Sequence, residues 1–346
     1  MSFTRKKVTR RVVIGSGIVL GTCGAGIGSA AFFALRGPNK QSNVGVLEFQ
    51  HPLAIPPVLE PTIDADGTRR FDLTLQTGSA SLFPQGDSET WGVNGPFLAP
   101  TLRARRGDSV AIDLHNELPE ASTIHWHGMH LPAMMDGGPH QMIDVGTIWS
   151  PSWEIEQPAA TLWYHPHPHG DTAEHVYRGI TGLFLIYDDE ESSLDLPRTY
   201  GVDDVPLILQ DKRVTEDGQF DLNAGSFLDN FTGSLSFGIR GEHILVNGTF
   251  DPFFTVTTSV VRFRVLNGSN TRFYNLGFTD DRSFSLLASD AGILRGPLPK
   301  LDRLLVGPGE RVEILVCFEA GETVILRSFE QDLAVEGVVE RQIGGE

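Results

Sequence analysis

From Val44 onward, apolar and polar residues alternate in short runs that are separated by turn-forming residues. The clearest runs are DSVAIDLHNEL at 108–118, SVVRFRVLNGS at 259–269 and RVEILVCFE at 311–319. A period of two places successive side chains on opposite faces of a strand. Strongly periodic helical stretches are absent, while Gly 38 and Pro 21 supply many turn positions. The pattern therefore predicts an all-β protein built from β-sandwiches.

Two pairs of stretches resemble each other at similar separations, which indicates a repeated domain. Residues 110–116 and 261–267 share the pattern V-x-[IF]-x-[LV]-x-N, and TLWYH at 161–165 resembles TVILR at 323–327. Generic strands can match by chance, but the similar offsets favour duplication of one sandwich. His165 of the first copy is then replaced by Arg327 in the second, so only the first copy carries the histidines.

An acidic segment poor in apolar residues, DDEESSLDLPRTYGVDDVP at 188–206, separates the two halves and is typical of a linker. We therefore expect a first domain at 44–190, a linker at 191–205 and a second domain at 206–346. Residues 1–40 precede them and are typical of a targeting segment rather than of a fold.

That N-terminal segment combines a basic cluster with a run free of charge at 12–35. TRRVVI at 9–14 resembles the bacterial twin-arginine export signal. The charge-free run is also long enough to span a bilayer, and positive-inside charge would leave the rest of the chain outside. Both interpretations predict a protein that is exported to the periplasm or to the extracytoplasmic face of the membrane. Cleavage and anchoring remain open alternatives.

Charge and cysteine content exclude two classes of protein. The chain has 44 acidic and 27 basic residues and a net charge of -17. It is therefore not expected to bind nucleic acid, because phosphate binding needs a basic face. Its two cysteines, Cys23 and Cys317, cannot form a disulfide framework. Cys317 lies in an alternating strand, where a buried free thiol is expected.

Nine of the 11 histidines fall between positions 115 and 175. Because residues i and i+2 of a strand share a face, His125 and His127 should project together, as should His165 and His167. Two such strands side by side would gather four imidazoles. Buried imidazoles are costly unless they are satisfied, and neutral imidazole suits copper, zinc, iron or nickel. A single strand histidine is usually structural, but two alternating pairs predict a metal site.

The residues around these pairs carry weaker signals. Pro166 and Pro168 lack an N–H, so the HPHPHG segment should be an edge or a strand end. His169 has the spacing of a ligand, but Gly170 permits a turn there. The four methionines of the segment 129–142 offer thioethers that favour cuprous copper, although they could equally fill gaps in a mobile loop. The other histidines are expected to be surface or core polar residues: His51, His115, His175 and His243.

The motifs NGPFLAPTLRARRGD at 94–108, HWHG at 125–128, DGGP at 136–139 and PAATLWYHPHPHG at 158–170 resemble the multicopper oxidases. This family includes laccases and copper-efflux oxidases, and the resemblance covers residues 44 to the end. It implies tandem cupredoxin-like Greek-key β-sandwiches and a trinuclear copper centre. It also implies that dioxygen is reduced to water there, while a small reducing substrate such as a phenol, or cuprous ion, loses one electron at a time.

Carried over by position, the resemblance implies that His125 binds type 2 copper and that His127, His165 and His167 bind type 3 copper. Asp136 matches the acidic residue that helps to deliver protons during oxygen reduction, and it is the one catalytic residue that we expect. A carboxylate beside a metal–oxygen centre is a sensible proton relay, although it could also be a loop cap.

The sequence departs from the family at the blue type 1 copper, which needs a cysteine thiolate and two histidines. Neither cysteine has a histidine neighbour. We therefore expect half of the trinuclear ligands, a third domain that is truncated or carried by a separate chain, and an isolated chain that is inactive. The alternatives are a non-catalytic cell-envelope scaffold and a copper-binding or buffering protein. Four convergent imidazoles speak against the scaffold, and no residue identifies the reducing substrate.

Overall fold

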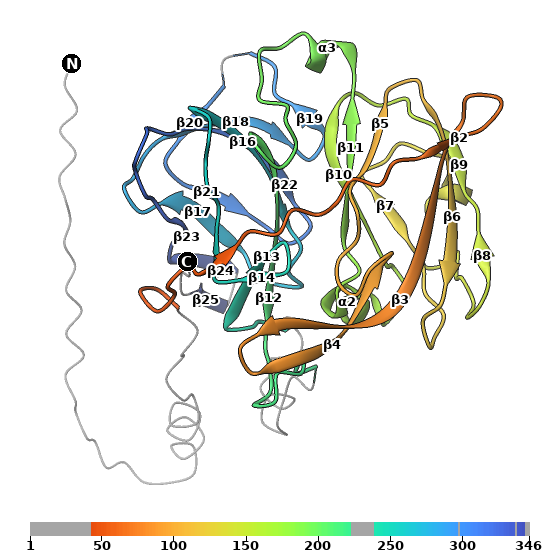
Figure 1. The fold of residues 1–346 in the computed structure, drawn as a ribbon, viewed down its shortest axis with the longest axis horizontal. Coiled ribbons are helices and arrows are strands. Elements are labelled where there is room, and N and C mark those ends of the chain that lie inside the picture. The colour runs from red at the N-terminus through yellow and green to blue at the C-terminus, as the bar shows by residue number, and fades with distance from the viewer. Residues whose placement is uncertain (1–42, 223–238, 297, 336–337, 343–346) are drawn as a thin grey trace. The chain divides into compact units, whose positions relative to one another are not determined.

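The computed structural model describes residues 43–222, 239–296, 298–335 and 338–342 (Figure 1). The described residues are built mostly from strands, which confirms the expected all-β class. The targeting segment lies outside the described residues. Within them, no helix combines the length and apolarity that a membrane crossing requires.

The first half of the chain forms two sheets that enclose one core, and we call them the first sandwich. One sheet has the order β2-β3-β6-β8, with β4 paired to β3 and β9 to β6; the other has the order β5-β11-β10-β7. Large apolar side chains from both sheets, such as Phe71, Trp126 and Phe184, fill the space between them. The strands are β2 (Thr62–Ile63), β3 (Arg69–Phe83), β4 (Gly86–Val93), β5 (Leu102–Arg105), β6 (Ser109–Asn116), β7 (His125–His127), β8 (Ile148–Trp149), β9 (Ser152–Glu154), β10 (Ala160–His165) and β11 (Gly182–Tyr187).

The second half repeats this design as a second sandwich. Its larger sheet has the order β14-β13-β12-β16-β22-β18-β19, with β20 paired to β18, and its smaller sheet has the order β21-β17-β23. The strands are β12 (Asp204–Lys212), β13 (His243–Val246), β14 (Thr249–Phe250), β16 (Val260–Asn267), β17 (Tyr274–Phe278), β18 (Phe284–Ser289), β19 (Gly292–Ile293), β20 (Lys300–Leu301), β21 (Leu304–Val306), β22 (Arg311–Cys317) and β23 (Leu326–Ser328). Two further pairs are β1 (His51–Pro52) with β15 (Pro252–Phe253) and β24 (Gln331–Val335) with β25 (Val338–Gln342).

The two sandwiches share a set of asparagine hydrogen bonds at the end of their matching strands. β6 runs parallel to β3, and β16 runs parallel to β12. Asn116 ends β6 and donates from Nδ2 to two backbone carbonyls, while its Oδ1 accepts from the N–H two residues on. Asn267 ends β16 and makes the same set of bonds. An asparagine at the same position of the pattern therefore closes an equivalent buried turn in each sandwich.

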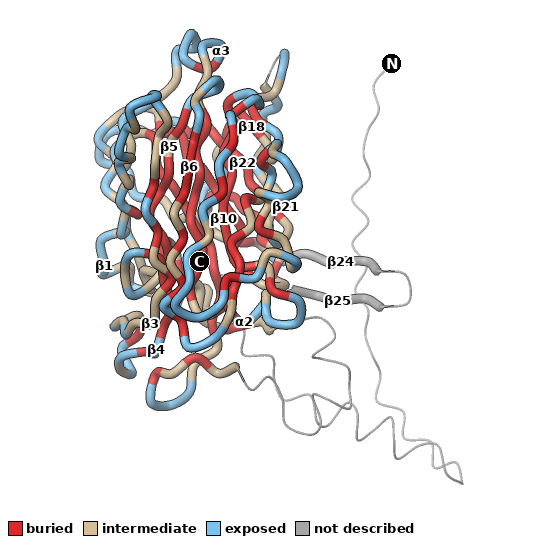
Figure 2. The backbone as a smooth tube through the Cα atoms, turned by 90° about the vertical axis from the view of Figure 1, so that its right-hand side faces the viewer, coloured by how far each residue is buried: buried red, intermediate tan, exposed pale blue. Residues whose placement is uncertain are grey.

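The sandwiches meet along a buried face to which β10 and β22 contribute; Figure 2 shows both strands within the buried middle. Arg262 Nη1 lies 2.7 Å from Glu191 Oε1, and Arg262 Nε donates to Glu313 Oε2 over 2.7 Å. Arg264 bonds Asp204 and Glu313, and all of these groups are buried. The charges are tolerated because each is paired and hydrogen-bonded.

The segment predicted to be a linker begins within this network of buried ion pairs. The short helix α3 (Asp189–Ser192) holds Glu191, whose carboxylate also accepts from Arg198 over 2.7 Å. An acidic residue that looks solvated in the sequence is therefore buried between two arginines. The boundaries at 191–205 stay a prediction.

Cys317 corrects one expectation. It is the last residue of β22, lies opposite Val260 and is exposed. Val312, Ile314 and Val316 of β22 face the core of the second sandwich, so alternation places Cys317 on the opposite face of the strand. At the strand end this face is open to solvent.

Candidate metal centre

Two antiparallel strands bring the first histidines together. β7 pairs with β10 in a register that places His125 opposite His165 and His127 opposite Trp163. Trp126, between the two β7 histidines, is 1% exposed and packs into the core. Its burial forces His125 and His127 onto the opposite face, where His165 also lies. The strand predicted to end in the HPHPHG segment does end at His165.

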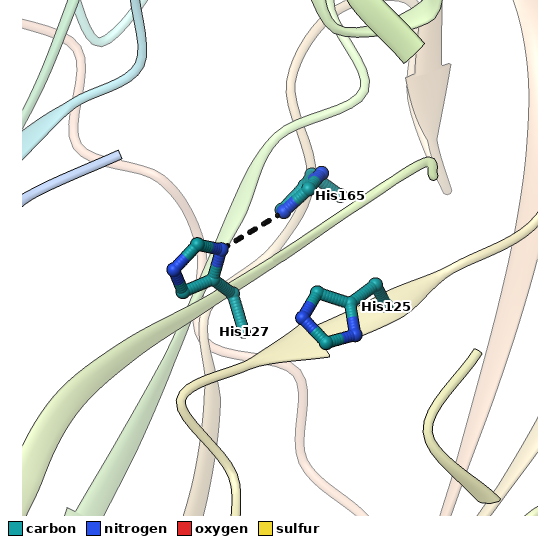
Figure 3. Close-up of side chains that lie close together, drawn as sticks. All are labelled: His125, His127 and His165. Atoms are coloured by element: carbon teal, nitrogen blue, oxygen red, sulfur yellow. Dashed lines mark hydrogen bonds between the residues drawn. The ribbon is translucent and has the colours of Figure 1, made fainter. Parts of the chain in front are cut away.

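Three of the four predicted ligands converge (Figure 3). Each of His125, His127 and His165 offers a ring nitrogen, and these three atoms all lie within 4.8 Å of one another. His127 Nδ1 lies 3.1 Å from His165 Nε2, so one ring donates a hydrogen bond to the other. Within the described ranges, this is the only group of at least three His, Cys, Asp or Glu side chains with such spacing.

Backbone carbonyls set the tautomers of these rings. His125 Nδ1 lies 3.0 Å from the carbonyl of Asp136, and His165 Nδ1 lies 2.7 Å from the carbonyl of Pro166. A carbonyl only accepts, so both Nδ1 atoms carry the proton and both Nε2 atoms keep a lone pair. His165 Nε2 then accepts from His127 Nδ1. A bound cation would take the place of that shared proton.

Burial keeps the rings of His127 and His165 neutral. Desolvation is the main cause that lowers the pKa of His127 to about 4, and the positive charge of the nearby Arg311 acts in the same direction. Desolvation also lowers the pKa of His165 well below its usual range, against the bond to Pro166. Neutral imidazole is the form that binds metal.

His167 lies beside the group but outside its closest shell. Its ring centroid is 5.4 Å from that of His125 and 5.9 Å from that of His165. Its backbone N–H donates to Thr123 Oγ1 over 2.6 Å. Its Nδ1 is buried and has no hydrogen-bond partner among the described residues. A buried acceptor or donor without a partner is costly, and a metal ion would satisfy it.

Asp136 reaches the site from a long loop. Its Oδ2 lies 3.4 Å from His125 Nδ1, and its side chain is 39% exposed, so the carboxylate joins the site to solvent. The next residue, Gly137, has a φ of 72°, and an added Cβ would collide with the carbonyl of Ile124. Glycine is therefore required for the loop to approach β7 and present Asp136.

The second sandwich closes the site from behind. The face of β10 that carries His165 also carries Thr161, which bonds Glu313, and Trp163, whose ring stacks on His165 at 4.0 Å. A Cβ at Gly309 would lie 3.7 Å from His127 Cε1, so this backbone lies directly against the ring. No sequence pattern predicts these neighbours, because Gly309 lies 182 positions beyond His127 and Trp163 acts only through packing.

The remaining predicted residues separate into distinct roles. His175 is fully buried on α2 (Thr172–Arg178), where Nδ1 bonds Ser122 Oγ over 2.9 Å and Nε2 bonds Glu120 over 2.7 Å, so it is a core polar residue as expected. The methionines do not form one cluster: Met129 packs in the core, whereas Met134 is 72% exposed.

Comparisons with known proteins agree with this geometry. The family model described as multicopper oxidase matches residues 74–191. A multicopper oxidase of Staphylococcus aureus is 38% identical over 274 residues, which are 79% of this chain and 59% of that protein. The cell division protein FtsP of Escherichia coli is also 38% identical, over 80% of this chain and 56% of that protein. The chain thus spans somewhat more than half the length of these relatives.

Solved structures show the same similarity. A laccase from Pediococcus acidilactici superposes with a TM-score of 0.75 at 35% identity, over 81% of this chain and 59% of that chain. A laccase-like multicopper oxidase from Ochrobactrum has a TM-score of 0.74 at 38% identity, over 85% of this chain and 63% of that chain.

Proposed function

The chain belongs to the multicopper oxidase family, and from that premise we propose that it supplies one side of a trinuclear copper centre in an exported oxidoreductase. The observation that carries the proposal is the convergence of His125, His127 and His165 from two paired strands. His167 and its unpartnered Nδ1 complete the proposed ligand set.

The residues present fit copper. The donor set is all imidazole, the rings of His127 and His165 are neutral, and two backbone carbonyls fix the tautomers of His125 and His165, as carbonyls commonly do for metal-binding histidines. Copper held here would supply the one-electron chemistry that reduces dioxygen to water. His125 and His127 hold it from β7, and His165 and His167 hold it from the end of β10.

Asp136 is proposed to hold and move a proton. Its carboxylate lies beside His125 and is partly open to solvent, so a proton can pass between water and the metal-facing side of the loop. Asp136→Asn keeps the size of the side chain and removes this capacity.

Electrons must enter from elsewhere, because no cysteine within the 346 residues has a histidine neighbour. We propose that a third cupredoxin domain provides the type 1 copper and the remaining ligands. The reducing substrate, a phenol or cuprous ion, would bind with that domain. Export is proposed from the N-terminal segment, with a twin-arginine signal or an anchor at 12–35.

A second candidate is a non-catalytic copper-binding or envelope scaffold, which the similarity to a cell division protein supports. A scaffold alone does not account for three imidazoles that converge on one point, and it has no need to retain copper. A non-catalytic copper-binding protein would retain copper, so only oxygen uptake after addition of a third domain separates it from the proposal.

The experiment measures copper content and oxygen uptake of the purified chain after loading with copper and removal of the unbound ion. We expect retained copper, no blue colour and no oxygen uptake with a phenol. Addition of a cupredoxin domain that carries a His-Cys-His run should produce the colour and the uptake. Asp136→Asn in that assembly should slow uptake and leave the blue band unchanged. Uptake by the unaided chain, or failure to retain copper, would overturn the proposal.

A further inference from the structure

A cavity of about 590 Å³ opens on the first sandwich beyond the histidine centre, beside the segment that follows β7. Met129, Leu131, Pro132 and Trp153 form its apolar wall. His130 and two carboxylates supply its polar groups. Its volume lies within the ~300–1,000 Å³ that small-molecule sites usually occupy.

Of the two carboxylates, Glu154 is the last residue of β9 and Glu156 lies two residues beyond it. They alternate with the buried Trp153 and Ile155, so both project to the exposed face. Within the described part of the chain, neither carboxylate has a basic ion-pair partner, and no lysine or arginine lines the cavity. The cavity therefore attracts cations and repels anions.

Two observations decide which kind of cation fits. His130, Glu154 and Glu156 do not form a group with metal-ligand spacing, in contrast to the three histidines of the copper centre. A bare metal ion would moreover leave a cavity of this size largely unfilled. The apolar side chains of Leu131 and Pro132 lie beside the two carboxylates in the cavity lining. This combination suits an organic cation with an apolar body.

We propose that this cavity binds a small amine with an aromatic or apolar body, through Glu154 and Glu156 on its ammonium group and through Met129, Leu131 and Pro132 on its body. The site is separate from the copper centre and does not depend on copper or on an electron-donating domain. His130 is 3 positions beyond His127 in the sequence, so an occupant sits next to the strand that carries the proposed ligands.

The test titrates the metal-free full chain with 2-phenylethylammonium by isothermal calorimetry, in chelator and at low ionic strength. We expect weak saturable binding, in the millimolar range for so small a ligand. The neutral isostere 2-phenylethanol should bind at least about threefold more weakly, because it forms no ion pair. Phenylacetate should not bind.

Variants locate the site. Glu154→Gln with Glu156→Gln should weaken amine binding by about threefold to tenfold, whereas Glu60→Gln, another exposed carboxylate, should leave it unchanged. His127→Ala should also leave it unchanged, so a failure of the copper proposal does not affect this result. The proposal is overturned by equal binding of the alcohol, by an unaltered double variant, by no binding at all, or by cupric ion displacing the amine stoichiometrically.

Discussion

The β7–β10 pair of the first sandwich and the β17–β23 pair of the second occupy the same place in a repeated design. β10 places His165 opposite His125, and β23 places Arg327 opposite Gly277. Two residues further along the chain, His127 corresponds to Thr279, which bonds Ile325. The backbone pairing is the same, but three imidazoles are replaced by glycine, threonine and arginine.

The loops that follow these strands differ as well. In the first sandwich, residues 128–147 separate β7 from β8 and carry Asp136 back to His125. In the second, only residues 279–283 separate β17 from β18. The strand pairing that both sandwiches share therefore does not by itself create the proposed metal site. The three histidines and the loop at 128–147 distinguish the first sandwich.

The sandwiches also differ on the matching faces of β6 and β16. Ala111 and Asp113 of β6 correspond to Arg262 and Arg264 of β16. Asp113 is partly exposed, whereas Arg264 is buried in the ion-pair network between the sandwiches. The first sandwich thus carries the proposed ligands, whereas the matching face of the second carries the buried arginines that join the two sandwiches.

The largest effect is expected from this buried network. Arg264→Met should lower the free energy of unfolding by about 3–5 kcal/mol, because it leaves the buried Asp204 without its ion-pair partner and Glu313 with Arg262 alone. Asp113→Asn, at the matching position of the first sandwich, should change stability little. Chemical denaturation followed by circular dichroism measures both. Equal effects would show that the two faces do not differ as described.

A smaller effect is expected in the long loop that only the first sandwich has. Gly137→Ala should cost about 2–4 kcal/mol, since it adds a collision with the Ile124 carbonyl to the strain of a positive φ. Gly146→Ala is the matched control: its φ is also 72°, but the space around it is open, so only about 1 kcal/mol should be lost. Copper affinity should fall only in Gly137→Ala. A loss of affinity in both variants would contradict the role of this loop.

A third effect, which depends on pH, concerns a buried lysine of the second sandwich. Lys212 donates to the Tyr177 carbonyl over 2.5 Å and lies 4.2 Å from the Tyr177 ring centroid; by register its counterpart in the first sandwich is Gly78. Burial lowers the pKa of Lys212 to about 7 from 10.5. The unfolded chain therefore binds more protons between these values.

The contribution of Lys212 to the free energy of unfolding is complete above pH ~10.5 and is lost as the pH falls to about 7. Between those limits, the wild type should gain up to about 1.4 kcal/mol per pH unit relative to Lys212→Met. Thermal unfolding of both proteins from pH 7 to pH 9.5 measures the difference. A difference that stays constant across this range would contradict the lowered pKa.

The sequence was sufficient for features that depend on local pattern. Alternation predicted the strands and the all-β class, and the shared asparagines 116 and 267 reflect the predicted duplication. The i, i+2 spacing predicted a common face for His125 and His127, because strand geometry alone determines it.

Features that depend on tertiary contacts were not predictable. The burial of Glu191, the approach of Gly309 to His127 and the exposure of Cys317 arise where distant segments meet or a strand ends. His165 and His167 share the predicted spacing, but β10 ends between them, so His167 lies outside the closest group.

The most direct test of the account compares copper affinity between matched positions of the two sandwiches, by titration of the metal-free chain and electron paramagnetic resonance of bound cupric ion. His127→Ala and His165→Ala should each weaken binding by at least about tenfold to a hundredfold and remove imidazole nitrogen couplings. Their counterparts, Thr279→Ala and Arg327→Ala, should bind copper as the unaltered chain does. Copper that binds equally well to all four variants would contradict a site formed by β7 and β10.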